Sequence, residues 1–248
     1  AINAMIYIRG NHWDYNNWAA LGCTGWSHDD VLPYFKRAEH NVRGEDPHHG
    51  GSGPLWVSDQ KWPNPGSVAF VEAAAQLQLP RNGDFNGAEQ AGFGLYQVTQ
   101  KEGERWSAAR AYVEPKRGSK NLDVRIGVSV QRLEIEDGRV TGVTYSVGDK
   151  QRTIRARGAV VLSAGAFNSP QIMMLSGIGP GEHLKEHGID VIVDKPAVGS
   201  DLQDHIDYVS SWQTESTDLI GDSLAGTVRM AKAIIEHRRK RTGIMTTP

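Results

Sequence analysis

Two short stretches bring together groups that could do chemistry. His183-Leu184-Lys185-Glu186-His187 has the His-x-x-Glu-His spacing, which places both imidazoles on one helix face, as a zinc peptidase site requires. The predicted helix is barely two turns long before Gly188 ends it, and no third ligand lies nearby in the sequence. We therefore interpret these histidines, and the His48-His49 pair in its glycine-rich loop, as solvated surface groups. We expect no metal site.

The second stretch, Gly177-Ile178-Gly179-Pro180-Gly181, has the glycine content of a phosphate-binding loop. Such a loop is delivered by a strand and opens into a helix N-terminus, whereas residues 170–176 (PQIMMLS) are typical of a helix. We therefore do not expect phosphate binding here. The sequence contains no Gly-x-Ser-x-Gly elbow, so a serine hydrolase has no visible nucleophile. The cations of residues 237–241 suit a helix C-terminus.

The elements that would position a ligand are clearest between residues 159 and 180. The apolar run AVVL over residues 159–162 predicts a parallel strand that is buried on both faces. Ser169 and Pro170 have the residue types of an N-cap and a first helical position, so we expect a sharp turn from strand to helix after Ala164-Gly165-Ala166. Small residues at that turn would let a ligand lie close to the backbone.

An antiparallel meander is predicted before that turn. Apolar residues alternate with polar or small ones from Leu122 to Val130, which indicates a half-buried strand. The pattern continues after a phase slip that suggests a bulge. Asp137-Gly138 predicts a hairpin turn, because both central positions must take positive φ. The return strand reaches Val147, and a third strand covers residues 153–156.

Other elements are predicted outside the meander. Ser27 and Asp30 have capping-box spacing at the start of a helix. Ser67 is a plausible cap for an alanine-rich helix. Period-two strands are expected near residues 206–214, and a helix with a basic end closes the chain.

Composition limits the class of protein. Lys plus Arg number 27 and Asp plus Glu 29 among 248 residues, a net charge of −2, so we expect no nucleic-acid partner. One cysteine, Cys23, excludes an internal disulfide framework and suits the cytoplasm. No apolar run approaches the roughly 18 residues of a membrane span. Peripheral association with the cytoplasmic side of a membrane is left open.

The motif at residues 165–179, GAFNSPQIMMLSGIG, fits the second signature of the glucose-methanol-choline (GMC) flavin oxidoreductases at every constrained position. The chain therefore resembles this family. Residues 2–10 (INAMIYIRG) look like the latter half of the family's first signature. Further similarities follow in family order at residues 85–87, 92–97 and 198–205.

The resemblance implies a mixed α/β (α+β) fold: an FAD/NAD(P)-binding Rossmann-like domain of GMC type, with an interleaved substrate-binding domain and incomplete at both ends. By this resemblance the FAD-binding parts are residues 1–39 and 105–204. The substrate-binding parts are residues 40–104 and 205–248.

The resemblance also implies FAD as the cofactor and oxidation of a primary alcohol, choline or an aliphatic alcohol, to an aldehyde. Hydride would pass to flavin N5, and a quinone or another acceptor would take the electrons. Ile2 stands where some members carry a flavin-linked histidine, so we expect no such link. The implied cofactor-binding residues contact flavin and phosphates (Asn3, Ala4, Met5), adenine (Val130) and the adenosine end (Ala164, Gly165).

No catalytic residue is assigned in this chain. By this resemblance the family's catalytic histidine would lie beyond residue 248, and its Gly-x-Gly-x-x-Gly loop would lie before residue 1. We do not assign the role of the catalytic histidine to His205. We therefore expect an internal fragment that is inactive by itself. Two alternatives stay open: an alcohol oxidase that uses oxygen and releases peroxide, and a non-catalytic binding or structural module.

Overall fold

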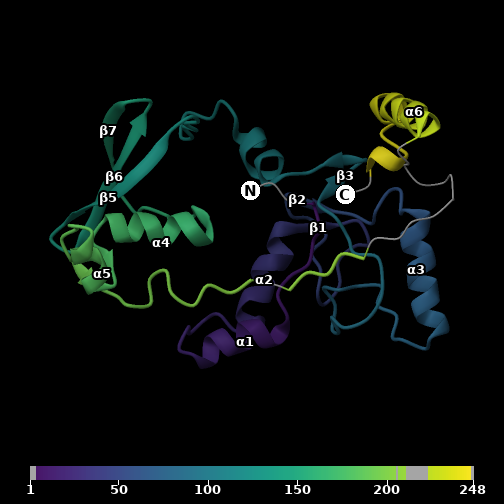
Figure 1. Ribbon diagram of the computed structural model, residues 1–248, viewed down its shortest axis with the longest axis horizontal. Helices are drawn as coiled ribbons and strands as arrows, with labels where there is room; N and C mark the ends of the chain where they lie inside the picture. Colours follow the sequence, from purple (N-terminus) through teal and green to yellow (C-terminus); the bar gives the residue numbers. More distant parts are fainter. Residues whose placement is uncertain (1–3, 205, 211–222, 247–248) are drawn as a thin grey trace. The chain divides into compact units, whose positions relative to one another are not determined.

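The computed structural model describes residues 4–204, 206–210 and 223–246. The chain forms two compact units. Unit 1 comprises Ala1–Leu122 and Gln213–Pro248, and unit 2 comprises Asp123–Trp212. Helices and short sheets alternate along the sequence (Figure 1), so the predicted mixed α/β class is confirmed. None of the described helices is long and apolar enough to cross a membrane.

Unit 1 joins short strands and helices by long ordered loops. Strand β1 runs parallel to β2, and β3 and β4 form an antiparallel hairpin. Its elements are α1 (His12–Ala20), α2 (His28–Ala38), β1 (Glu39–Asn41), β2 (Leu55–Val57), α3 (Pro65–Gln76), β3 (Gln100–Lys101), β4 (Glu104–Arg105), a π-helical turn (Ala109–Val113), a 3₁₀ turn (Glu114–Lys116), α6 (Leu224–Lys240) and a second 3₁₀ turn (Ile244–Thr246).

The starts of α2 and α3 follow from their caps. Ser27 caps α2 in a capping box with Asp30, as the sequence predicted. The predicted cap of α3, Ser67, is wrong: Asn64 caps that helix and Pro65 occupies its first turn. The reason is that Pro65 fixes a helical φ without needing an N–H partner, and the Asn64 side chain accepts the N–H of the following glycine at 2.8 Å.

The centre of unit 1 is the segment around Val98. Val98 and Val57 have no exposed surface. Val98 exchanges both backbone hydrogen bonds with Ser58, each 2.9 Å, and also bridges Ile6 in antiparallel orientation. The segment that begins at Ala4 is therefore an outer strand-like edge laid against the buried centre of this unit.

Unit 2 is a meander with a helix packed on it (Figure 1). The meander is the predicted one, in the order β5-β6-β7. Asp137 and Gly138 take φ values of 50° and 74°, and the register shifts between Val130 and Arg132, so the turn and the bulge are confirmed. The elements are β5 (Ser129–Glu136), β6 (Arg139–Val147), β7 (Lys150–Arg155), α4 (Gly165–Leu175), β8 (Ile178–Gly179), α5 (Gly181–Glu186) and β9 (Val193–Asp194).

The first strand of the meander begins later than predicted, and two further predicted strands do not form over the residues described. Residues 121–128 are not a strand, and Ile126 is 90% exposed. Residues 159–163 are not a buried parallel strand either, and Val161 is 85% exposed. A strand needs a hydrogen-bonded neighbour, and no described strand pairs with these segments. Residues 206–210 form no strand, and residues 211–214 lie outside the described part of the chain.

Helix α4 begins earlier than predicted. Its N-cap is Ala164, so Ser169 and Pro170 lie inside the helix and are not its cap and first residue. Gly165 makes the early start possible, because its φ of 92° turns the chain sharply at that point. The Ser169 hydroxyl accepts the Ala164 N–H at 3.0 Å from within the first turns.

Candidate functional site

The residues implied as cofactor contacts are divided between the two units. Ala4 and Met5 belong to unit 1, and Val130, Ala164 and Gly165 belong to unit 2. Asn3 lies outside the described residues.

In unit 1 the backbone at Met5 is unusual. Met5 has a φ of 65° and is 8% exposed, whereas the other non-glycine residues with positive φ in the described ranges are exposed. A non-glycine residue in this region costs about 1–3 kcal/mol and persists only where its surroundings hold it. Here Thr99 donates its N–H to the Met5 carbonyl at 2.8 Å. The chain is thus bent at the position implied to approach the flavin.

The side-chain amides of Asn86 and Gln90 hold the backbone that follows Met5. Asn86 donates to the Tyr7 carbonyl at 2.8 Å and accepts the Arg9 N–H at 2.7 Å. Gln90 donates to the Arg9 carbonyl at 2.9 Å. Ala4, by contrast, is exposed. The backbone held in this way adjoins an exposed residue, an arrangement that suits a backbone contact to a ligand.

The Tyr7 side chain adds no negative charge beside this segment. Burial raises the pKa of Tyr7, and the opposing effect of Arg9 does not cancel it, so the phenol stays neutral at neutral pH. The Arg9 guanidinium lies 5.2 Å from the centre of the Phe35 ring. This segment thus offers a ligand backbone polarity without an ionised phenol.

In unit 2 the start of α4 is open. Gly165 has a φ of 92°, and no atom lies within 4 Å of the position that a Cβ would take. The glycine is therefore required by the backbone and not by close packing. Ala164 beside it is exposed. The first N–H groups of a helix lack intrahelical partners, so this end of α4 can receive the polar edge of a ligand.

The other end of α4 is anchored to the meander through Ser176. The Ser176 hydroxyl accepts the Leu133 N–H of β5 at 2.8 Å and donates to the Ile172 carbonyl at 2.5 Å. On the same strand Val130, 39% exposed, lies at the register shift. Because β5 is the edge of the three-stranded sheet, Val130 combines an edge position with a disturbed ladder. The structure thus places Val130 and Gly165 on two elements that pack together (Figure 1).

The glycine-rich stretch after α4 has a packing role. Gly177 has a φ of 82°, and a Cβ there would lie 2.5 Å from the Asp190 carbonyl oxygen. Gly181, which opens α5, donates its N–H to the Asp194 carboxylate at 2.9 Å. A carboxylate already holds that helix end, and a phosphate there would meet its negative charge.

The histidines weighed for metal binding differ from one another. His183 and His187 are exposed, as predicted, with ring centres 4.7 Å apart. Among the described residues no group of three or more His, Cys, Asp and Glu side chains is placed to hold a metal ion.

The interpretation of His49 as a solvated histidine is wrong. It is 4% exposed and lies between the carboxylates of Glu39 and Asp84. Sequence reasoning missed this cluster because its members are far apart along the chain, and no local spacing identifies them. The only available signal was the density of polar side chains in the loops at residues 45–49 and 82–86.

The sequence was compared with known proteins. The family model described as GMC oxidoreductase matches residues 1–207. The oxygen-dependent choline dehydrogenase of Rhizobium etli (strain CIAT 652) is 47% identical over 208 residues, which is 84% of this chain and 38% of that protein. The protein of the same name from Brucella suis biovar 1 (strain 1330) is 43% identical over 90% of this chain and 40% of its own length. The chain thus spans about two fifths of these relatives.

Solved structures were compared in the same way. Pyridoxine 4-oxidase from Mesorbium loti is 34% identical with a TM-score of 0.72, over 78% of this chain and 38% of that one. An FAD-dependent oxidoreductase from Chaetomium thermophilum is 28% identical with a TM-score of 0.83, over 99% of this chain and 45% of that one.

Proposed function

We propose that this chain, which belongs to the GMC oxidoreductase family, binds FAD and takes part in the oxidation of a primary alcohol to an aldehyde. The observation that carries the proposal is the turn at Gly165, in the segment with the family's second signature. The chain turns there with a φ of 92° and leaves open space beside an exposed helix start. A larger residue would take that φ only with strain and would fill part of the open space.

The residues present fit the flat, polar-edged parts of FAD. Backbone groups at Asn3, Ala4 and Met5 would contact the flavin and the phosphates, and Val130 would meet the adenine from the edge of β5. Ala164 and Gly165 would lie against the adenosine end. Val161 and Phe167, on either side of that turn, are 85% and 75% exposed. Apolar area of this kind is stabilised when a ligand or protein surface covers it.

Bound FAD would supply a hydride acceptor for the carbinol carbon of the alcohol. The role proposed for this chain is to bind and orient: the segment held by Asn86 fixes backbone at one place, and Ser176 fixes α4 on β5. A base must also take the hydroxyl proton, and we assign no described residue to that step. The alcohol and the electron acceptor are proposals for a whole protein of which this chain spans about 38% in the relatives.

The substrate class proposed is choline or another primary alcohol, because the relatives at 43–47% identity are named choline dehydrogenases. We propose a quinone or a similar carrier as electron acceptor. The proposed location is the cytoplasm or the cytoplasmic side of a membrane.

The test uses protein expressed from the whole gene and purified with FAD. Choline and straight-chain primary alcohols are added without oxygen while the flavin spectrum is recorded. Bleaching by choline at lower concentration than by the other alcohols is the expected result. If the protein holds FAD but no alcohol bleaches the flavin, the proposed substrate class is contradicted. If the protein folds correctly but holds no FAD, the proposed cofactor is contradicted.

Oxygen is the second acceptor to be tested, because the relatives are named oxygen-dependent and a structural neighbour is an oxidase. The bleached flavin is exposed to air and peroxide is measured against aldehyde. Peroxide formed at the rate at which the alcohol is consumed would assign an oxidase, whereas turnover that needs a quinone analogue would assign a dehydrogenase.

A further inference from the structure

A cluster of charged side chains in unit 1 surrounds the fully buried Glu39. Glu39 on β1 has no exposed surface, and its carboxylate receives the Arg9 guanidinium at 2.6 Å. His49 lies against the same carboxylate, with Nδ1 at 3.1 and 3.2 Å from the two oxygens. Its other ring nitrogen, Nε2, lies 2.9 Å from the Asp84 carboxylate. Four ionisable groups from separate segments thus meet, three of them buried and the fourth, Asp84, with its side chain 31% exposed.

The geometry determines the protonation state of the His49 ring. An ionised carboxylate only accepts hydrogen bonds, so a ring nitrogen that faces one must hold a hydrogen. Both nitrogens of His49 face carboxylates, which calls for the imidazolium form. With His49 charged, two cations balance two anions in the cluster, and no buried charge is left alone. The hydrogen bond to Glu39 raises the pKa of His49; burial opposes this, and the hydrogen bond to Asp84 adds to the increase.

One competing arrangement has to be weighed. The Asn41 amide nitrogen lies 3.0 Å from His49 Nδ1, so a neutral ring could accept a hydrogen there. That amide also lies 3.1 Å from Glu39 and 2.9 Å from the Gln97 side-chain oxygen, and it has only two hydrogens. A neutral Nδ1 would in addition point its lone pair at Glu39. The imidazolium removes both conflicts.

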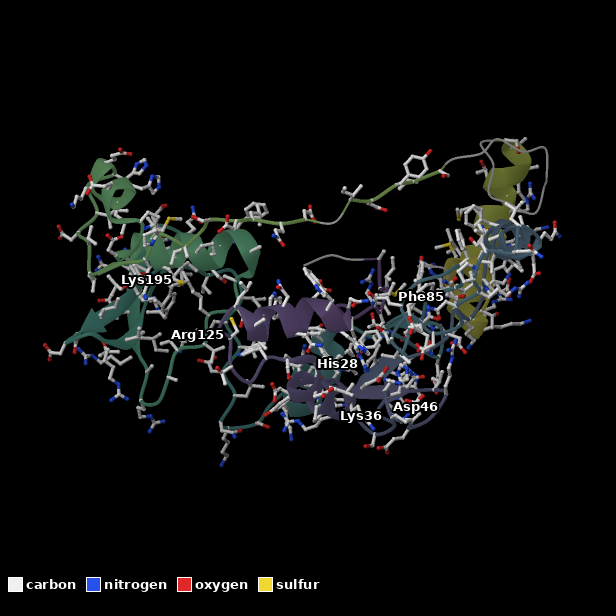
Figure 2. All side chains as sticks on the ribbon, turned by 90° about the horizontal axis from the view of Figure 1, so that it is seen from below. His28, Lys36, Asp46, Phe85, Arg125 and Lys195 are labelled. Atoms are coloured by element: carbon white, nitrogen blue, oxygen red, sulfur yellow. The ribbon has the colours of Figure 1, made fainter. Side chains whose placement is uncertain are left out.

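The cluster ties together the two loops that hold residues 5–10. In the first loop, Asp46 accepts the N–H groups of His48 and His49, each at 2.7 Å, and Arg9 donates to the His48 carbonyl at 2.7 Å. Lys36 of α2 binds the Asp46 carbonyl at 2.7 Å, and Figure 2 shows these two residues side by side.

The second loop is reached through Asp84. One oxygen of Asp84 binds His49, and the other accepts the N–H of Asn86 at 3.0 Å. Asn86 in turn holds the backbone of Tyr7 and Arg9. His49 is therefore the link between a loop that binds the Arg9 side chain and a loop that binds the Arg9 backbone.

We infer that His49 is a positioning residue: held as an imidazolium between Glu39 and Asp84, it fixes residues 5–10 and with them the bent backbone at Met5. The inference about the charge state stands on the cluster alone. Its consequence for a bound flavin rests on the proposed function.

The pH dependence follows from the groups that face the ring. A raised pKa in the folded protein means that His49 stabilises the fold fully below about pH 6.5, its unfolded pKa, and that this contribution is lost as pH rises through the folded value. The charged groups around the ring come from every element packed against it: Glu39 from β1, Arg9 from the first segment, Asp46 from the His49 loop, Asp84 from its own loop, and Arg43, which binds the Gly83 carbonyl.

The direct test is an NMR titration of the histidine rings in the 248-residue chain, with His49→Gln used only to assign the resonance. We expect the ring of His49 to stay protonated at pH 7. A neutral ring at pH 7 overturns the inference. Because the wild-type chain is measured, the result does not depend on whether the variant folds.

The second test concerns position and keeps the two proposals apart. Hydrogen exchange at the amides of residues 5–10 is compared between pH 6 and a pH above the measured pKa of His49. At the higher pH we expect the amides of residues 5–10 to exchange about tenfold faster, after correction for intrinsic rates. The amides of β6 should be unaffected. Equal corrected rates overturn the positioning role whether or not FAD binds. In FAD-loaded protein the flavin spectrum should shift over the same pH range; if only this shift is absent, the contact of residues 3–5 with flavin fails and the role of His49 stands.

Discussion

Glu39 of unit 1 and Val161 of unit 2 depart from ordinary burial in opposite directions. The carboxylate of Glu39 is entirely buried, yet it has partners in Arg9, His49 and Asn41. Val161 is apolar and 85% exposed, and residues 159–163 take part in no strand pairing. The first region pairs its carboxylates and cations within its own unit, although Arg9 Nε and His48 Nδ1 have no hydrogen-bond partner among the described residues. The second presents apolar surface that nothing in the described part of its unit covers.

The difference separates two kinds of experiment. Where a region is internally satisfied, changing a residue alters the stability of the chain, because partners are left without bonds. Where a region is exposed, the same kind of change alters stability little and acts on whatever the region binds. Four comparisons, in order of decreasing effect, test this separation.

The largest effect is expected from Glu39→Gln. The variant keeps the shape but removes the negative charge, so Arg9 and His49 lose their shared partner in a buried place. Breaking a buried charge pair costs about 3–5 kcal/mol of unfolding free energy. Denaturant unfolding followed by tryptophan fluorescence measures it, since every tryptophan except Trp212 belongs to unit 1.

The matched control for Glu39 is Glu182→Gln. Glu182 pairs with Lys185 at 2.9 Å on the surface of α5, and both side chains are exposed. Its loss should cost less than about 1 kcal/mol, measured by hydrogen exchange in unit 2. If Glu39→Gln costs no more than this, the buried cluster is not a stabilising element of unit 1.

The next effect is a contrast between two glycines of unit 2. Gly177 and Gly165 both have positive φ, which costs an alanine about 1–2 kcal/mol. At Gly177 the new Cβ would also lie 2.5 Å from the Asp190 carbonyl, whereas at Gly165 it would meet open space. We expect Gly177→Ala to cost about 3 kcal/mol or more and Gly165→Ala about 1 kcal/mol. Amide hydrogen exchange of β6 reports both values.

For FAD retention we expect the opposite order, with the larger loss in Gly165→Ala. Gly165→Ala places a methyl group in the space assigned to the ligand, so it should weaken FAD retention more than its effect on stability explains. Gly177→Ala, once folded, should retain FAD. Equal losses of stability for the two variants would mean that φ alone matters and that the open space at Gly165 has no separate significance.

The third comparison, with Asp84→Asn, acts through pH. Burial tends to raise the pKa of Asp84, but the hydrogen bonds from His49 and from the Asn86 N–H lower it below its ordinary value. A lowered pKa in the folded state means that Asp84 stabilises the fold above about pH 3.8, and that this is lost as pH falls through the folded value. The variant should lose about 1–2 kcal/mol at pH 6.

The acid limb of the stability profile distinguishes this from a packing defect. Wild type should lose stability relative to Asp84→Asn as the pH falls below 3.8, so that the two curves converge. Asp29→Asn, whose side chain is 99% exposed, serves as control and should follow the wild-type curve. A constant gap between wild type and Asp84→Asn at all pH values would contradict an ionic role.

Local patterns were sufficient for some elements and not for others. The Asp137-Gly138 turn and the Ser27 cap of α2 were predicted correctly, because both depend on residues adjacent or three apart in the sequence. The strand at residues 159–162 was predicted from hydrophobicity alone, and hydrophobicity does not supply a hydrogen-bonding partner. Its failure is a failure of pairing and not of composition.

The candidate sites show the same limit. Gly165 could be predicted from a motif, because the role proposed for it depends on its own φ. His49 could not, because its charge state depends on Glu39 and Asp84, which lie 10 and 35 residues away. Helix α4 started at Gly165 and not at Ser169, since the backbone freedom of glycine outweighed the usual cap preference.

The smallest effect on stability is expected from Val161→Ser. The side chain is 85% exposed, so the variant removes little buried area and should change the unfolding free energy by no more than about 0.5 kcal/mol. Ile126→Ser is the matched control, because Ile126 is 90% exposed and also lies in an unpaired segment of unit 2. Only Val161 adjoins the turn assigned to the adenosine end, so in FAD-loaded protein Val161→Ser should weaken flavin retention and Ile126→Ser should not. Equal retention by the two variants would show that FAD does not cover the exposed valine. The contrast between the two units would then concern protein packing alone.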